Sequence, residues 1–327
     1  MDPAQFCSQT RLFIVAGKGG VGKTTVTAAL ARMAALAGLT TLIVEVEGKS
    51  GLGTAFGRSD PLTYDEVVLS QGGGPSGAAD VRARTLRPDD ALIEYLEDHG
   101  LRRVSKRLAQ SGALDVVATA VPGIKDILVL GKVKQLERAE TADVIVLDAP
   151  AAGHAVSFLM SARALLDAAR VGPIRAQAQD VVELLADPAR CQVILVTLPE
   201  ETPVNELVDT AYQLEDRVGV ALAPVVVNGA YAELSQLDRD PMEAAREAGV
   251  RLSDSEAAAL RTAATFRSHR QRLQAEQLER LASALPLAQL RLPFIFSSEI
   301  GPADVDRLAA ALAEQVAALP ARGFTSR

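Results

Sequence analysis

The chain is poor in aromatic residues and in cysteine, and it has no excess of positive charge. Aromatic side chains make up 4% of its 327 residues, with no tryptophan, so the core has to be built mainly from Ala, Val and Leu. The two cysteines, Cys7 and Cys191, lie far apart in no metal-ligand spacing and indicate neither a disulfide framework nor a zinc site. The net charge of −7 argues against a nucleic-acid scaffold, where a basic surface is expected.

Long apolar runs are also absent. No run approaches the length needed to cross a bilayer, and the polar segment 1–10 is unlike a signal peptide. We therefore expect a cytoplasmic protein with no integral membrane segment and no nucleic-acid partner.

One glycine-rich segment, Gly17–Thr25, matches the pattern G-x-x-x-x-G-K-[ST] of phosphate-binding loops. It follows the apolar run 12–16 and precedes a segment of helical composition, 26–33, which is the strand–loop–helix context that the pattern requires. The glycines allow consecutive backbone N–H groups to form an anion-sized nest, and the helix directs the positive end of its dipole at the same point. In such a loop Lys23 contacts the β- and γ-phosphates, and the hydroxyl of Thr24 completes the shell of a bound Mg²⁺. The predicted nucleotide ligands in the loop are Gly19, Gly20, Val21, Gly22, Lys23, Thr24 and Thr25.

Strand-like apolar runs alternate with helical segments along the chain, which predicts an α/β fold, a doubly wound and mainly parallel sheet flanked by helices. We predict a single domain over residues 8–327, with a helical subdomain formed by insertions at roughly 88–140 and 155–188. The segment 57–80, with its Gly, Pro and Ser residues, is expected to be a mobile connection. The S-x-x-E form of Ser253–Glu256 predicts the start of a long helix. The predicted strands are 12–16, 40–46, 81–86, 143–148, 191–197, 220–227 and 287–292.

Polar residues stand at the ends of several predicted strands. Glu45 and Glu47 follow the second strand, Asp148 follows four apolar residues, and Asn228 follows another apolar run. Because ligands of open parallel sheets bind at the carboxyl ends of the strands, we expect these side chains to gather at one site. Asp148 is placed as the acid of a nucleotide-site metal shell, and the alternative for it is a cap of the next helix.

Glu47 is the candidate that accepts a hydrogen bond from the attacking water and holds it in line with the γ-phosphate. Glu45 is the other candidate for this role. The alternative for Glu47 is that it is a solvated carboxylate in a loop. His154 lies in a glycine-bearing loop after Asp148, where it could sense the γ-phosphate or be a plain loop residue.

Lys18 directly follows the first glycine of the loop, a position at which an ordinary phosphate loop has no need of lysine. Only seven of the 34 basic residues are lysines, so composition would rarely supply one there. The side chain is expected to point away from its own nest and to reach the phosphates of a facing subunit. Such a cation would neutralise transition-state charge as an arginine finger does.

The loop segment Lys18–Thr24 resembles the deviant phosphate loop of a family of ATPases. This family includes the arsenite-pump ATPase, the tail-anchored-protein targeting ATPase and the MinD/ParA proteins, and the chain resembles a bacterial member. Further similarity to the first two lies in Asp148–His154 (their switch II, D-T-A-P-T-G-H), Pro122–Asp126 (P-G-I-D-E), Pro88–Tyr95 and the adenine-side loop Pro293–Gly301.

The resemblance implies a P-loop NTPase fold with ATP and Mg²⁺ as cofactors. It implies that Asp148, Gly153 and His154 act as a switch, with Thr24 and Asp148 at the metal. It also implies that Asn228 and Pro293 lie at the adenine.

The chain departs from the family pattern at switch I, where D-P-A-H is replaced by Glu47–Ser50, so that the water-positioning Asp becomes Glu47. Lys49 is an added charge there. The arsenic-binding cysteines and the zinc-binding C-x-x-C pair are missing, and the segment 154–191 has one methionine, Met160. Arsenite transport and tail-anchor delivery are therefore poorly supported.

We expect an ATP-binding, ATP-hydrolysing, Mg²⁺-dependent dimeric switch that resembles anion-transporting and membrane-protein-targeting ATPases. The dimer is a homodimer or a heterodimer with a paralogous ATPase subunit, and hydrolysis is coupled to a protein client or a membrane-protein partner. One alternative is a non-hydrolysing nucleotide-binding regulatory subunit. Another is a MinD/ParA-type positioning ATPase, which would need a membrane-targeting amphipathic tail. The segment 303–319 has few basic residues and is expected to be a core-packing helix instead.

Overall fold

A computed structural model of the chain describes residues 1–46, 51–73, 77–98, 100, 123–150 and 152–320. The strands in this part of the chain are β1 (Leu12–Gly17), β2 (Thr41–Val46), β3 (Val67–Ser70), β4 (Val81–Leu86), β5 (Val144–Asp148), β6 (Cys191–Thr197), β7 (Ala221–Leu222), β8 (Val225–Ala230) and β9 (Gln289–Pro293). They form one sheet in the order β3-β4-β2-β5-β1-β6-β8-β9, with β7 paired to β6. Every pairing is parallel except that of β3 with β4. The predicted α/β fold is confirmed.

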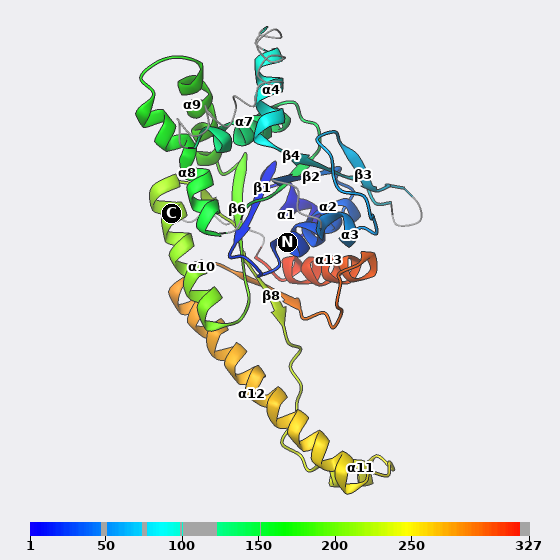
Figure 1. Cartoon of the computed structure of the whole chain (residues 1–327). Helices are drawn as coiled ribbons and strands as arrows, with labels where there is room; N and C mark the ends of the chain where they lie inside the picture. The colour runs from blue at the N-terminus through cyan, green and yellow to red at the C-terminus, as the bar shows by residue number, and fades with distance from the viewer. Residues whose placement is uncertain (47–50, 74–76, 99, 101–122, 151, 321–327) are drawn as a thin grey trace.

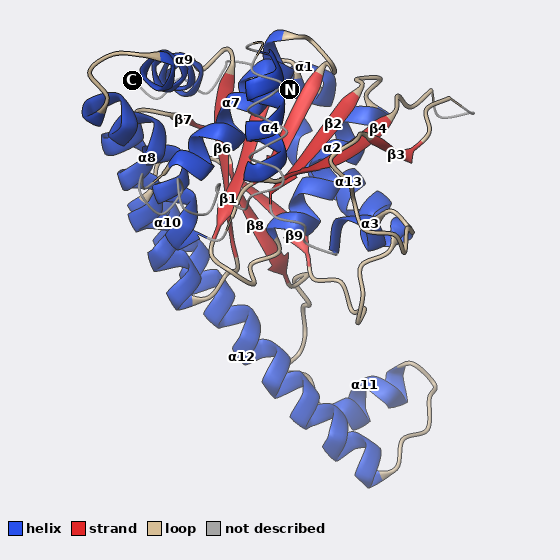
Figure 2. Cartoon of the chain, turned by 45° about the horizontal axis from the view of Figure 1, so that its top comes forward, coloured by secondary structure: helices blue, strands red, loops and turns tan. Residues whose placement is uncertain are grey.

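Helices cover both faces of the sheet (Figures 1 and 2). The described helices are α1 (Pro3–Cys7), α2 (Lys23–Leu36), α3 (Gly51–Ala55), α4 (Pro88–Asp98), α7 (Ile124–Arg138), α8 (Ala152–Ala168), α9 (Pro173–Ala186), α10 (Glu201–Gln213), α11 (Pro241–Glu247), α12 (Asp254–Ala284) and α13 (Pro302–Ala317), with a π-helical turn at Leu214–Val218. One apolar cluster joins a face of the sheet to α1, α2 and α13, and a second joins the other face to α7, α8, α9 and α10. Successive residues of β1 alternate between the two clusters, which explains why this strand is apolar without interruption.

The chain between β2 and β4 is more ordered than its composition predicts. The segment 57–80, expected to be a mobile connection, contains β3, which pairs with β4 as an antiparallel edge strand. The prediction failed because a three-residue apolar run, Val67–Leu69, is too short to indicate a strand until a neighbour supplies its hydrogen bonds. The capping box predicted at Ser253–Glu256 is confirmed at the start of α12.

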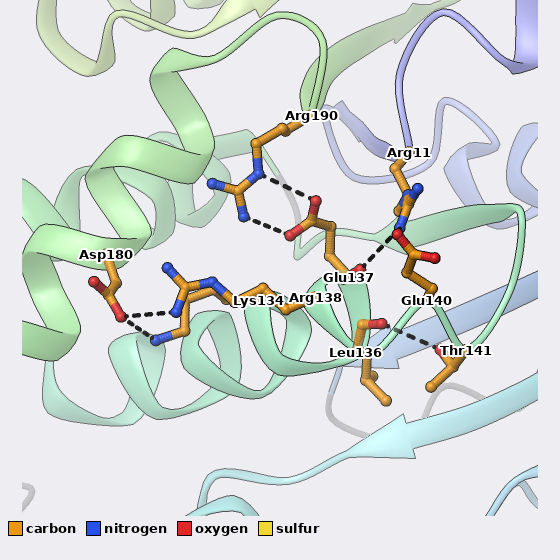
Figure 3. A network of polar contacts seen from close by, with 9 residues as sticks. All are labelled: Arg11, Lys134, Leu136, Glu137, Arg138, Glu140, Thr141, Asp180 and Arg190. Atoms are coloured by element: carbon orange, nitrogen blue, oxygen red, sulfur yellow. Dashed lines mark hydrogen bonds and ion pairs between the residues drawn. The ribbon is translucent and has the colours of Figure 1, made fainter.

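Charged side chains fix α7 against α9 and the sheet (Figure 3). The side chain of Glu137, 7% exposed, accepts hydrogen bonds from Arg190, which directly precedes β6. Nζ of Lys134 lies 2.8 Å from Oδ2 of Asp180, and this hydrogen bond lowers the pKa of the Asp180 carboxyl. Because Arg190 directly precedes β6, the Glu137–Arg190 pair lies at the amino end of this strand and not at the carboxyl edge.

An arm that the sequence did not predict projects between β8 and β9. We use "the arm" for residues 231–284, which include α11 and α12. In Figures 1 and 2, α11 and the adjoining half of α12 lie away from the sheet. Of the 31 residues of α12, only Ala257, Gln274 and Leu281 are buried. Neither α12 nor any other helix in the described part of the chain is both long enough and apolar enough to cross a bilayer.

Candidate functional site

The glycine-rich segment forms a tight loop between β1 and α2, at the carboxyl edge of the sheet. Gly22 caps α2 with φ of 89°. A Cβ at this residue would lie 2.2 Å from Nδ2 of Asn228. Backbone conformation and lack of space therefore both require glycine. The same amide of Asn228 donates a hydrogen bond to the carbonyl of Val21 (2.9 Å), so the end of β8 holds the loop from the side.

The loop presents positive charge at the beginning of α2. This helix has no side-chain cap, and its own first turn contains no acidic residue. Lys23 is 7% exposed, and its Nζ donates to the carbonyl of Lys18 across the loop (3.1 Å). Gly19 and Gly20 are exposed, and Thr25 lies in the first turn of α2. A lysine and a helix end that converge on one loop favour an anion with several oxygens.

A hydroxyl and a carboxylate meet beside this loop. Oγ1 of Thr24 donates to Oδ2 of Asp148 at 2.7 Å. Asp148 ends β5 with no exposed surface, and the sheet register sets it opposite Val15 of β1 and Glu45 of β2. Two oxygen donors of this kind suit Mg²⁺, a hard cation that prefers carboxylate and hydroxyl ligands. The donor set therefore fits the predicted metal.

The other predicted site residues fall at the same edge or outside the described residues. Glu45 is fully buried in β2, and Glu47 lies outside the described residues. Gly153 and His154, expected in a loop, belong to the first turn of α8 instead, because this helix already begins at Ala152. Pro293 ends β9 and pairs with Ala230, two residues beyond Asn228.

Lys18 has a partner that sequence reasoning missed. Its ammonium lies 2.5 Å from Oε1 of Glu206, on α10, and the two side chains are 43% and 40% exposed. A cavity of about 590 Å³ opens here, lined by residues of α8 and α10 that include Met160 and Asp209. Lys18 is thus held by a carboxylate of a neighbouring helix. No local signal could have identified Glu206, which is 188 residues away in the chain.

Comparison with known proteins identifies the family. A sequence model described as anion-transporting ATPase matches residues 10–170. A protein of Mycobacterium bovis named putative ATPase Mb3704 is 32% identical over 329 residues, which cover 94% of each chain. A protein of Mycobacterium tuberculosis named ATPase BagA has the same identity and coverage. The chain belongs to the anion-transporting ATPase family.

Other family relatives cover less of the chain. An arsenical pump-driving ATPase of Escherichia coli is 28% identical over 249 residues, which cover 70% of this chain and 41% of that protein. The family match contains the glycine-rich loop, Glu45 and Asp148, so it includes the loop and the acid that meet at the carboxyl edge. Membership in an ATPase family makes ATP the nucleotide expected at this loop.

Proposed function

We propose that the chain is a Mg²⁺-dependent ATPase that closes as a dimer over ATP and uses hydrolysis to reset that dimer. The observation that carries the proposal is the hydrogen bond between Thr24 and Asp148 beside the glycine-rich loop. Triphosphate hydrolysis needs groups that bind the phosphates and groups that bind the metal, and the residues that we propose for these two roles lie side by side.

In this proposal, different residues at the carboxyl edge bind the phosphates, the metal and the base. The backbone N–H groups of 19–25 and the ammonium of Lys23 hold the phosphates, and Thr24 and Asp148 hold the metal. Mg²⁺, when bound, neutralises charge on the phosphate oxygens. Asn228 and Pro293 stand at the base end of the site.

Two groups are proposed to act on the reaction itself. Glu47, the residue directly after β2, orients the attacking water, with Glu45 next in line for this role. Lys18 neutralises charge on the phosphates of the facing subunit. Its contact with α10 supports this role, because the ammonium is bonded to a carboxylate outside the loop and is not directed into its own nest.

The switch residues link the nucleotide to α8. Asp148 ends β5, and Gly153 and His154 lie in the first turn of α8, so we propose that a change at the metal reaches this helix. Because α8 also lines the cavity beside Lys18, that cavity would change with the nucleotide state. We propose that a protein client or a membrane-protein partner responds to this change.

The Lys18–Glu206 pair gives a first test. Glu206→Gln should raise turnover by up to about fivefold, because an exposed ion pair contributes up to about 1 kcal/mol and its loss frees Lys18. Steady-state ATPase rates at limiting chain concentration measure the effect. Asp209→Asn, one turn along α10 in the same cavity, is the matched control and should change nothing.

The proposal requires that Glu206 affects turnover only through its contact with Lys18. In a Lys18→Ala background, Glu206→Gln should therefore have no effect on turnover. An equal rise in both backgrounds would mean that Glu206 acts on something else.

Single-turnover hydrolysis at increasing chain concentration tests the function as a whole. A homodimer predicts a rate per chain that rises with concentration and then saturates. A heterodimer predicts a low rate that rises when the protein that co-purifies in a slowly hydrolysed ATP analogue is added. Tight ATP binding without hydrolysis under both conditions would contradict the ATPase function and would favour the non-hydrolysing regulatory subunit.

The MinD/ParA-type alternative loses support because α13 packs on α2 in the core through residues such as Leu308 and Leu312.

A further inference from the structure

The first half of α12 projects beyond the edge of the sheet that holds the glycine-rich loop. Helix α10 begins just after β6 reaches this edge, and it runs beside the second half of α12. A guanidinium nitrogen of Arg270 lies 3.2 Å from Oε1 of Glu200, and the hydroxyl of Tyr212 donates to the carbonyl of Ala284 at 2.9 Å. Residues 254–269 therefore extend past the start of α10, by about 24 Å at 1.5 Å per residue. Figures 1 and 2 show this part of the helix away from the sheet.

One side of the projecting helix is exposed and partly apolar. Phe266 is 65% exposed, and Ala259, Thr262 and Ala263 are exposed with it. Spacings of three, four and seven residues place these side chains on one face of α12, whereas Ala257, on the opposite face, is buried within the arm. Five of the twelve exposed large hydrophobic side chains in the described part of the chain belong to the arm. Such a concentration of exposed apolar surface indicates an interaction site. We use "the free face" for Ala259, Thr262, Ala263 and Phe266.

The free face is complementary in size to an antiparallel copy of itself. If a two-fold axis passes between residues 262 and 263, Phe266 of each helix lies opposite Ala259 of the other, and Thr262 lies opposite Ala263. Large side chains then meet small ones, as close packing between helices requires. In a parallel pair, ring would meet ring and alanine would meet alanine, which leaves a clash and a gap. A two-fold axis also repeats each favourable contact.

The charges of α12 favour the same direction. Its first turn contains Asp254 and Glu256, whereas residues 267–272 contain three arginines, one histidine and no acid. The antiparallel pair brings Glu256 of one helix near Arg270 of the other, and a guanidinium has N–H groups left over after one contact with Glu200. A parallel pair would set acids against acids and arginines against arginines. Exposed ion pairs contribute little affinity, so their main effect is to select the antiparallel direction.

We propose that residues 255–270 of α12 pair in the antiparallel direction with the same residues of a second copy of this chain. The proposal rests on the proposed function, because closure of two subunits over ATP brings together the carboxyl edges from which the arms project. The pairing stabilises the ATP-bound dimer outside the nucleotide sites. It also selects the partner, since a subunit without an alanine opposite Phe266 cannot pack in the same way. The arm therefore favours a homodimer.

Phe266→Ala tests the pairing. It should raise the dissociation constant of the dimer by about 30-fold or more, which corresponds to the 2 kcal/mol that truncation of an aromatic side chain at the centre of an interface costs. Sedimentation of the full chain with a slowly hydrolysed ATP analogue and Mg²⁺ measures this constant. Leu260→Ala is the matched control and should leave it unchanged, because Leu260 is 48% exposed on the same helix but lies about a third of a turn away from Phe266.

An exchange of the two facing side chains gives a sharper test. Ala259→Phe alone sets ring against ring and should weaken the dimer. In the double variant Ala259→Phe and Phe266→Ala, each ring again lies opposite an alanine, so dimer affinity should return to near that of the unsubstituted chain. A side chain that matters only for the fold of the arm would not be rescued by this exchange.

Cross-linking reports the direction of the pair. Cys7 and Cys191 are fully buried, so a disulfide between chains should form only through introduced thiols. Thr262→Cys lies next to the proposed axis and should cross-link under mild oxidation when the ATP analogue is bound. Ser268→Cys, exposed on the other side of α12, is the control and should not. Ala259→Cys should not cross-link either, because the two introduced thiols would lie about seven residues, or about 10 Å, apart along the pair.

The outcomes separate this pairing from the dimer itself. Unchanged dimer affinity in Phe266→Ala, or a cross-link through Ala259→Cys, would overturn the pairing and leave the ATP-bound dimer in place. If the unsubstituted chain joins a different protein in the ATP analogue and not a second copy, the pairing is wrong and the heterodimer stands. If it binds the analogue and stays monomeric with every partner tested, the dimer of the proposed function fails as well.

Discussion

Lys18→Ala is expected to lower ATP turnover by about 10³-fold or more while ATP affinity stays near that of the unsubstituted chain. The ammonium is bonded to Glu206 and not directed into its own loop, so its removal leaves the phosphate ligands intact. What is lost is a cation that acts on transition-state charge, for which the comparable arginine finger contributes about 10³- to 10⁵-fold. Single-turnover rates at saturating ATP measure the loss, and calorimetry measures the affinity. Turnover that persists in this variant would end the role assigned to Lys18.

Mixing two inactive variants tests whether Lys18 acts on the facing subunit. In a dimer of one Lys18→Ala chain and one Lys23→Ala chain, one of the two sites has an intact loop and receives Lys18 from the other chain. The mixture should therefore recover activity that neither variant has alone. If the unsubstituted chain is active by itself and the mixture is not, Lys18 acts within its own subunit.

Lys23→Ala should abolish measurable ATP binding. The side chain is almost fully buried, with its ammonium directed across the loop that is proposed to hold the phosphates. Removal of one partner from a buried charge pair costs about 2–5 kcal/mol, or about 30-fold or more in affinity. Calorimetry with ATP and Mg²⁺ measures the loss. Lys18→Ala is the control for loss of a lysine in the same loop, and an unchanged affinity in Lys23→Ala would rule out the phosphate site.

The residues of the candidate site at the carboxyl edge could be predicted from sequence because they are either local to one segment or brought together by the strand topology. The loop motif, its flanking strand and its helix occupy one short segment, and each determines the conformation of the next. Asp148 and Asn228 lie far from this segment in the chain. Parallel strands bring their carboxyl ends together, and both residues do contact the loop segment through Thr24 and Val21.

The contacts that the sequence did not predict depend on long-range packing. Glu206 is an ordinary acid on an amphipathic helix, and only the placement of α10 beside the loop brings it to Lys18. Tyr231 also packs against two rings more than 60 positions later in the chain, Phe294 and Phe296, and these become its neighbours because β8 pairs with β9. The arm was missed for another reason. Its capping box correctly located the start of α12, but a cap contains no information about whether the helix packs on the sheet.

One departure from the family pattern bears on whether the proposed dimer is a homodimer or a heterodimer. The chain shares an anion-transporting ATPase domain, yet its acid after β2 is Glu47 and not Asp. If Glu47 orients the attacking water as proposed, its extra methylene would change the position of the carboxylate, and a facing paralogue with the conventional Asp is the heterodimer that we propose as the alternative to a homodimer. The concentration series and the partner addition described above separate that arrangement from a homodimer.

A crystal structure with a slowly hydrolysed ATP analogue and Mg²⁺ is the most direct measurement of the account. We expect triphosphate density against residues 19–24, Mg²⁺ between Thr24 and Asp148, and a second subunit across the γ-phosphate. Triphosphate density at any other place on the molecule would contradict the account.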